Sequence, residues 1–566
     1  MFNDVGWAKG KPARLILYLS IVTATFSGWV MGAGNTIITG IIKNASGQPV
    51  AGALVKVGSS ETGLTFMVVS QAQGRYTTPS LLPGKYSVQG FGGGYQSEAA
   101  GPVNVAGDTQ AKMDVSLSVP QKEYSATNRL PDAQYAAMMP DGEGKRLLLS
   151  HCTLCHGTWK YVTRRKTPKQ WEQKVTEMRF NLLQKLQELQ HAAAGETPKG
   201  ALTDHEYEVI LDYVAKNFGM DTPLPPSEPS KEVNRLLPRT LLQGAAAKYV
   251  AMELKLPGGQ QVGAFALDPQ GTLWISELTS GIFGRFDPKT MTYSRIFTPP
   301  GKVVLPWHDD LFGTVAIDPQ GKIWFTSNVI PNAQWFQYDP QSKQILKTFD
   351  VPVPTIPGGD VLFNQLQFHS NGSIWATGTA YHRLVKVDAG TGKVTEFTQS
   401  PVRWGQHPFG IVIAGDNMIW FAADDDGAVI RVDPDTGKMT PYKINGQKPG
   451  ARRIETDADG NLWIATQAGR KLVKLDYRTG KMAEYPFPSA SAGHDVDVDK
   501  KRNLIWFSEA DAAKLGRFDP STNTFVEFSL PEANEVPWMS KLDPTHPNRI
   551  WWNTRSGKLG YVEVIE

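Results

Sequence analysis

A repeated unit fills the second half of the chain and limits the fold more than any other feature. The unit has the form Asp-x-x-Gly-x-(Ile/Leu)-Trp followed by (Arg/Lys)-(Phe/Val/Leu)-Asp-x-x-Thr, as in "DPQGTLWISELTSGIFGRFDPKT", and the other copies follow it with local departures. The repeated tryptophans lie 43 to 51 residues apart, at Trp274, Trp324, Trp375, Trp420, Trp463, Trp506 and Trp551. Short strands and turns at this period are typical of propeller blades. Seven copies predict a seven-bladed β-propeller over residues 250–566.

The ring is expected to close through the segment that precedes the first full unit. "YVAMELKLP" matches the strand that ends a blade, as in "FVEFSLP", so we expect it to complete the last blade. Closure removes the exposed edges that an open array of strands would leave. The repeated Trp and Asp residues are expected to serve packing and turns, not a functional site.

Residues 1–34 have the layout of a secretory signal. Lys9, Lys11 and Arg14 precede an apolar run from Leu15 to Phe26, and small residues follow at 32–34. The alternative is an uncleaved N-terminal anchor, because 28–31 extend the apolar run. Either way we expect a periplasmic or secreted protein. A formal net charge of +3 in 566 residues gives no polybasic field, so no nucleic-acid partner is expected.

Residues 36–118 alternate apolar and polar positions between turn signals, which predicts a small antiparallel β-sandwich. The phrases "GIIKNASGQPVAGALVKV" and "GRYTTPSLLPGKYSV" resemble the carboxypeptidase regulatory-like domain. That resemblance implies a structural or adhesive spacer. Carbohydrate or cell-surface contact is the alternative, and would make the protein a binding module.

The only two cysteines of the chain lie in one motif, Cys152-x-x-Cys155-His156, within residues 122–220. This spacing is the attachment signature of c-type haem, in which both thiols bond the macrocycle and the adjacent histidine is the proximal iron ligand. A zinc site would need a second ligand pair, and no further cysteine offers thiolates. A thioredoxin-type pair would follow a strand, whereas this motif follows a helical segment. We therefore expect one covalent haem c.

The surrounding segment resembles a monohaem cytochrome c domain, and its helix signals agree. Capping boxes at 167–170 and 203–206 predict helices to about residue 189 and to residue 219, and 221–249 reads as a linker. Met178 is our expected distal ligand, because it lies two turns after Trp171 on one helix face and "WEQKVTEM" resembles the segment after the haem motif in related domains. Met220, His191 and Met139 are the rival ligands.

The units "WFSE" and "WFTS" and the closing "EFSLP" resemble the streptogramin lyase (virginiamycin B lyase) family across residues 250–566. The resemblance implies C–O elimination on a cyclic depsipeptide by histidines, a glutamate and magnesium. One family histidine matches His494 in "AGHDVDVD", but Trp538 stands at the second histidine position and Arg555 at the glutamate position. Elimination needs both a base and an acid, so lyase activity is the less favoured function.

The loops that lead into successive blades of a propeller converge on one mouth of the central channel. They carry His308, His407, Arg452, Arg453 and His494, which we predict as a ligand site for an anion or a metal-assisted ligand. The whole pattern predicts a mainly β multidomain protein with a helical cytochrome domain. Its expected function is electron transfer, with the propeller binding a substrate or a redox partner, either a protein or a small-molecule donor. Whether the chain is itself an oxidoreductase is left open by the sequence.

Overall fold

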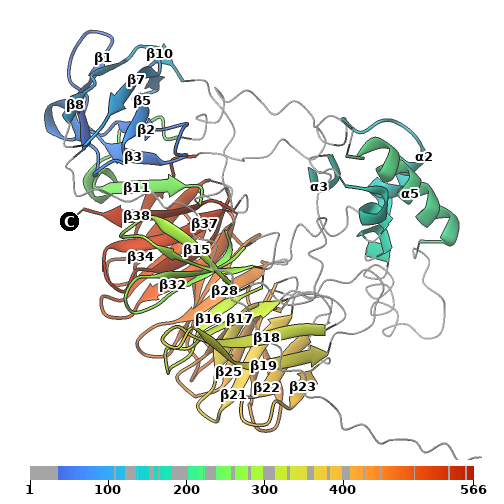
Figure 1. Cartoon of the computed structure of the whole chain (residues 1–566). Helices are drawn as coiled ribbons and strands as arrows, with labels where there is room; N and C mark the ends of the chain where they lie inside the picture. The colour runs from blue at the N-terminus through green and yellow to red at the C-terminus, as the bar shows by residue number, and fades with distance from the viewer. Residues whose placement is uncertain are drawn as a thin grey trace, which may run out of the picture.

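The computed structural model describes residues 36–107, 110–121, most of 136–179, 202–220, 222 and 237–565, apart from short stretches between strands. The longest of those stretches are 298–312, 353–362 and 398–407. The predicted signal at 1–34 lies outside the described residues. Within them the protein is mainly β, with a small sandwich, a helical segment and a propeller (Figure 1). The predicted mainly β, multidomain class is confirmed.

The N-terminal sandwich contains two sheets. One holds β4, β1 and β8, with β9 also on β1, and the other includes β10, β6, β5, β2 and β3, with β7 on β5. The strands are β1 (Ile37–Asn44), β2 (Leu54–Gly58), β3 (Thr65–Val69), β4 (Arg75–Thr77), β5 (Gly84–Gly92), β6 (Tyr95–Gln96), β7 (Ala100–Val105), β8 (Gln110–Lys112), β9 (Val115–Leu117) and β10 (Val119–Pro120), with a 3-10 turn η1 (Ala72–Gly74).

The expectation of a purely antiparallel sandwich is wrong at one strand. β1 pairs with β8 and β9 in parallel, and the partner changes between Thr39 and Ile42. Gly40 explains the change, because a Cβ there would lie 1.9 Å from the carbonyl oxygen of Met113. The close approach of the two backbones is possible only without a side chain. Alternating polarity predicts a strand but does not report the direction of its neighbour.

The helical segment contains α2 (Glu143–His151), α3 (Trp159–Val162) and α5 (Asp204–Asn217) among the described residues. Both predicted capping boxes are present. The Thr203 hydroxyl accepts from the Glu206 amide while the Glu206 carboxylate accepts from the Thr203 amide, and Thr167 and Gln170 exchange the same pair of bonds. Each box satisfies amides that the first helical turn leaves without partners. No helix in the described part of the chain is long and apolar enough to cross a membrane.

The propeller is built from four-stranded antiparallel sheets, and the described residues contain seven, counting β36, β37, β38 and β11. The strands are β11 (Tyr249–Leu254), after a 3-10 turn η3 (Gly244–Ala247), β12 (Val262–Leu267), β13 (Leu273–Glu277), β14 (Phe283–Asp287), β15 (Thr292–Phe297), β16 (Val315–Ile317), β17 (Ile323–Ser327), β18 (Asn332–Asp339), β19 (Gln344–Pro352), β20 (Phe363–Phe368), β21 (Ser373–Gly378), β22 (Arg383–Asp388), β23 (Val394–Phe397), β24 (Pro408–Ile413), β25 (Ile419–Ala423), β26 (Ala428–Val432), β27 (Met439–Lys443), β28 (Ala451–Thr456), β29 (Leu462–Thr466), β30 (Lys471–Leu475), β31 (Met482–Pro486), β32 (Gly493–Asp499), β33 (Leu504–Glu509), β34 (Lys514–Asp519), β35 (Thr524–Ser529), β36 (Pro537–Leu542), β37 (Arg549–Thr554) and β38 (Leu559–Val564).

The ring closes as the sequence predicts. The first strands of the blades, β12, β16, β20, β24, β28, β32 and β36, contact one another in chain order, and β36 also contacts β12. In the last blade β11 pairs with β38 in antiparallel register over the whole strand, from Tyr249 opposite Val564 to Leu254 opposite Leu559. The N-terminal strand of the propeller therefore completes the blade that the C-terminus begins.

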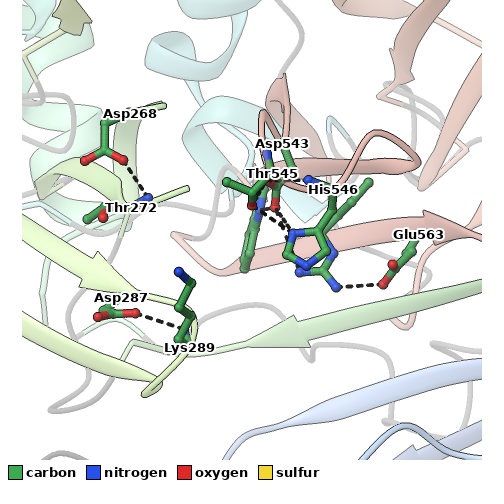
Figure 2. A network of polar contacts seen from close by, with 10 residues as sticks. Asp268, Thr272, Asp287, Lys289, Asp543, Thr545, His546 and Glu563 are labelled. Carbon is green, nitrogen blue, oxygen red and sulfur yellow. Dashed lines mark hydrogen bonds and ion pairs between the residues drawn. The ribbon is translucent and has the colours of Figure 1, made fainter. Parts of the chain in front are cut away.

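The repeated Asp and Trp form a turn device, as predicted. Asp268 accepts from the amides of Gln270 and Thr272 through one carboxylate oxygen and from the indole of Trp274 through the other, at 3.0 Å. Asp318, Asp457 and Asp543 accept from Trp324, Trp463 and Trp551 in the same way, whereas Asp416 accepts from the Met418 amide and the Trp420 indole through one oxygen and from Arg431 through the other. Figure 2 shows the turns at Asp268 and Asp543. The motif stabilises the hairpin between the first two strands and fixes the buried indole.

The sandwich and the propeller share one sheet, which the sequence did not predict. β3 pairs with β11 from Thr65 opposite Glu253 to Val68 opposite Val250, so the sandwich sheet continues into the last blade. Figure 1 shows β2 and β3 beside β11 and β38. Phe66 and Met252 belong to one buried cluster that also contains Trp551 of the last blade. These two parts are therefore joined by main-chain hydrogen bonds and by a common core.

The helical segment is inserted at one point of this β body. The Gln121 amide donates to the carbonyl of Gly94, and the Gly94 amide donates to the carbonyl of Arg239, at 2.8 and 2.7 Å. The chain thus leaves towards the helices and returns from them at the same turn, between β5 and β6. Of the predicted linker 221–249, the part from Leu237 lies against the sandwich, where Leu242 donates to Gly52.

We expect Met252→Ala to destabilise the sandwich and the propeller together, because Met252 is 2% exposed within their common core. Large-to-small changes of this kind cost about 2–5 kcal/mol. Thermal unfolding by calorimetry should show a single lowered transition for both parts, while Lys255→Ala, at an exposed position just beyond the same strand, leaves it in place. A variant that lowers the transition of only one part would contradict the shared core.

Candidate functional site

The predicted haem residues Cys152, Cys155 and His156 lie outside the described residues, directly after α2. Helix α2 packs against α5, the last helix of the segment. The contact is close, because a Cβ on Gly144 would lie 2.3 Å from the Cβ of Tyr213. On α5, Ile210 and Val214 are fully buried and Tyr207 and Leu211 pack on the same cluster, as the helical spacing predicts. Helices α2 and α5 therefore pack on one core, and α2 ends at the residue before the motif.

Met178 lies at the edge of this core. Its side chain is half-buried, packs on the cluster that contains Trp171, and accepts a hydrogen bond at sulfur from the Tyr161 hydroxyl at 3.3 Å. Trp171 is buried and its indole donates to the carbonyl of Phe218 at 2.9 Å, which ties this helix to the end of α5. The two residues thus share one face of a helix, as expected.

The rival ligands occupy different environments. Met139 is 2% exposed inside the same core, whereas Met220 is 61% exposed beyond α5. His191 lies outside the described residues. A thioether that is half-buried at a core surface can reach a bound group without leaving the core, which distinguishes Met178 from the two other methionines.

In the propeller, the described part of the channel mouth is built around Phe409, at the start of β24. The Arg452 guanidinium lies 4.7 Å and the Arg453 guanidinium 5.2 Å from the ring centroid, and the His494 imidazole meets the ring edge-on at 5.5 Å. Cation–π contacts of this kind strengthen when they are removed from water. Phe409, Arg453 and His494 are each under 5% exposed. The predicted basic residues are therefore gathered, but onto an aromatic ring.

Bulges aim these side chains. Six of the seven inner strands, β12, β20, β24, β28, β32 and β36, shift register against their neighbour near their first residues. In β28 the shift lies between Ala451 and Ile454, and in β32 between Gly493 and Val496. A bulge inserts an unpaired residue and redirects its side chain. Arg452, Arg453 and His494 all lie within such shifts.

The two arginines have different partners. Arg452 donates to Gln467 and forms an ion pair with Asp424, Nε to Oδ2 at 3.2 Å. Arg453 reaches across β24 towards Asn364 and Gln365 of β20, with Nη1 3.4 Å from each acceptor. Gly410 lets it pass, because a Cβ there would lie 2.8 Å from the Cα of Arg453.

His494 faces the next blade. Its Nδ1 lies 2.6 Å from the carbonyl oxygen of Trp538, and the two rings are 4.1 Å apart. The carboxylate of the adjacent Asp495 accepts from the Ser540 amide, and the Asp495 amide donates to the Ser508 hydroxyl oxygen. Burial raises the pKa of Asp495, which the nearby Lys541 and Arg453 oppose. Burial likewise lowers the pKa of Arg453, and Asp495 opposes that change.

Sequence reasoning missed a second set of charges, deeper in the channel. The residues opposite the repeated tryptophans include Glu455, Asp497 and Lys541 in three consecutive blades. Lys541 Nζ lies 4.0 Å from Asp497, and Lys500 lies 3.7 Å from Glu455. Burial acts to lower the pKa of Lys541, but the surrounding carboxylates raise it overall. No simple signal in the sequence marks them, because these positions precede the Trp of their blade by 8, 9 and 10 residues in turn.

The remaining predicted mouth residues, His308 and His407, lie outside the described residues, as does Arg555. Among the residues that the structure describes, no three His, Cys, Asp or Glu side chains come together as a metal site. Among the described mouth residues, Phe409, Arg453 and His494 are buried and Arg452 is partly exposed.

Comparison with known proteins supports the two β domains. The sequence model of the virginiamycin B lyase family matches residues 313–564, and that of the carboxypeptidase regulatory-like domain matches 37–118. Within the chain, therefore, a carboxypeptidase regulatory-like domain precedes a virginiamycin B lyase-like propeller. Neither model covers residues 122–220. A search of curated proteins found no match.

Solved structures with a similar course of the chain include two lyases. Virginiamycin B lyase from Staphylococcus aureus is 21% identical with a TM-score of 0.48, and the match covers 56% of this chain and 100% of that one. A streptogramin B lyase structure gives 21% and 0.48, covering 57% and 100%. The extracellular domain of a hybrid two-component system from B. thetaiotaomicron gives 16% and 0.41, covering 53% and 40%.

Proposed function

We propose that the chain is an exported c-type haem electron-transfer protein whose propeller binds a redox partner or a substrate. The observation that carries the proposal is the Cys152-x-x-Cys155-His156 motif, which holds both cysteines of the chain and directly follows α2. Two cysteines at this spacing, with a histidine directly after the second, are the donor set for covalent haem attachment. The apolar run within residues 1–34 supports export, which suits this modification.

The residues that would hold the haem are Cys152 and Cys155 through thioether bonds, His156 as proximal ligand and Met178 as distal ligand. Imidazole and thioether are a common pair of axial donors in cytochromes c, and a bound haem supplies reversible one-electron transfer. The crossing of α2 and α5 and the half-buried Met178 sulfur support the fit. The Tyr161 hydroxyl restrains the sulfur, and the sulfur keeps a second lone pair for a metal.

The propeller supports binding more than chemistry. The guanidinium groups of Arg452 and Arg453 lie over the ring of Phe409. Asp424 offsets the charge of Arg452, and Asp495 offsets that of Arg453. Phe409, Arg453 and His494 are buried there, so the partly exposed Arg452 is the part of this group that a partner would contact. Carbohydrate or cell-surface recognition by the sandwich is the alternative function. Because β3 pairs with β11, a ligand bound to the sandwich would be held in a fixed position relative to the propeller.

Lyase activity is a second candidate, favoured by the family match over residues 313–564. Its one matched histidine, His494, is 2% exposed and lies against the Trp538 carbonyl. Trp538 has no group that exchanges a proton near neutral pH, and the side chain of Arg555 stays protonated. We therefore favour electron transfer over lyase activity as the function of this chain.

We expect Cys152→Ala to lose most covalently bound haem, because one of two thioether bonds is removed. Haem staining of the denatured protein after export in a host that matures cytochromes c measures this directly. Met220→Ala is the matched control and should keep the full signal, since Met220 is exposed outside the core. An unchanged signal in Cys152→Ala would reject the attachment site.

We expect Met178→Ala to abolish the near-infrared absorption band that accompanies methionine–iron coordination, and to lower the reduction potential. A thioether ligand raises the potential relative to a second nitrogen ligand, so its loss has this sign. Met139→Leu conserves volume in the core and should keep the band. A band that persists in Met178→Ala would transfer the assignment to another residue.

We expect no linearisation of streptogramin-type depsipeptides by the purified chain. A general base and a general acid each contribute typically ~10²- to 10⁴-fold, and only one of the family's histidines is matched. Chromatography of the incubated depsipeptide tests this. A linear product that disappears in His494→Ala would establish the lyase instead.

A further inference from the structure

Blade six holds two glutamates side by side with one lysine. Glu509 is the last residue of β33 and lies opposite Lys514, the first residue of β34. Glu527 of β35 lies opposite Gly516, two residues further along β34. The Phe507 ring lies over Gly516, 2.0 Å from where a Cβ would stand. The two carboxyl groups lie within hydrogen-bonding reach of each other, close to the end of the blade where β32 begins.

The two carboxyl groups are bonded very differently. Glu527 accepts from Lys514 Nζ at 2.6 Å and from the Ser489 amide at 2.9 Å, so it is held as a carboxylate. Glu509 is fully buried, and no donor among the described residues reaches either of its oxygens. A buried carboxylate without a donor is costly, whereas a protonated carboxyl group becomes a donor itself. Glu527 is the acceptor within its reach.

Blade one shows the same positions with the charge balanced. Glu277 ends β13 as Glu509 ends β33, and Arg295 lies opposite Gly284 as Glu527 lies opposite Gly516. Arg295 donates to both oxygens of Glu277, at 2.8 and 2.9 Å, and Tyr293 adds a third bond. Blade six therefore has an acid where blade one has the arginine that neutralises the buried glutamate.

We propose that Glu509 and Glu527 share one proton, which Glu509 carries and donates to the Glu527 carboxylate, and that this bond braces the start of β32. Ser489, whose amide is bound by Glu527, lies in the segment that leads into β32, and Gly493 at the start of that strand lies opposite Glu509. The strand then presents His494 and Asp495 to the channel mouth. The pair makes this end of the propeller sensitive to pH.

The sign of the effect follows from the surroundings of Glu509. Burial first, and then the charge of Glu527, raise its pKa well above the ordinary value, while Lys514 acts to lower it. Lys514 from β34 and Glu527 from β35 are the charged groups that face it in the described blade. A carboxyl group with a raised native pKa contributes stability below its ordinary pKa of about 4.3, and this is lost as pH rises through the native pKa. Blade six is therefore weakened towards high pH.

Hydrogen exchange followed by mass spectrometry tests this on the full chain, on peptides within 487–529, between pH 5 and 9. Comparing wild type with Glu509→Gln at each pH cancels the intrinsic exchange rates. Gln mimics the neutral acid, so protection of the wild type should fall relative to the variant as pH rises, by up to about tenfold per pH unit until the native pKa is passed, and then level off, because the native state holds one proton that the opened state releases. A ratio that stays constant with pH would overturn the proposal.

Two controls keep the test decisive. Glu277→Gln should lower protection in blade one at every pH, since Arg295 then keeps a charge without its partner. Glu527→Gln removes the charge that helps to raise the pKa of Glu509, so the pH-dependent loss should shrink and begin at lower pH. Infrared difference spectra at neutral pH give a direct readout, because a protonated carboxyl band should be present in the wild type and absent in Glu509→Gln. Absence of that band would contradict the shared proton. The inference is independent of the haem assignment.

Discussion

The pairing of β3 with β11 is the interaction on which the rest of the β structure depends. β11 lies between β3 and β38, so each of its two edges is hydrogen-bonded to a different domain. All six of its residues are buried, unlike the outer strands β27 and β31 of other blades. A strand covered on both edges and both faces cannot leave without exposing apolar surface and unpaired amides. The same six residues close the ring and hold the sandwich.

Much of the propeller was predictable because its determinants are local and repeated. The Asp and Trp of each unit are six residues apart in blades one, two and five, and one carboxylate satisfies both the turn and the indole there. Capping boxes at Thr167 and Thr203 are equally local. A contact whose two parts are neighbours in sequence leaves a pattern that can be read. The closing strand was recognisable for the same reason, since it resembles the ends of other blades.

What could not be predicted depends on contacts between distant segments. Nothing in Thr65–Val69 indicates that its partner is Tyr249–Leu254, because both patterns fit any buried strand. At the channel mouth the repeat located Arg452, Arg453 and His494, but not the bulges that turn them onto Phe409. Side-chain direction at a bulge is set by the neighbouring blade, and that information is not local.

The turn at Gly94 gives the molecule a particular kind of modularity. Gln121, before the helical segment, and Arg239, after it, are both hydrogen-bonded to Gly94. Residues 122–238 are therefore one long insertion whose two ends meet at the same turn of the β body. The cost of closing a loop grows only with the logarithm of its length. Segments of other lengths, or other compact domains with neighbouring ends, fit at this turn without altering any strand register. The β body is thus a scaffold with one insertion point, and the helical segment occupies it.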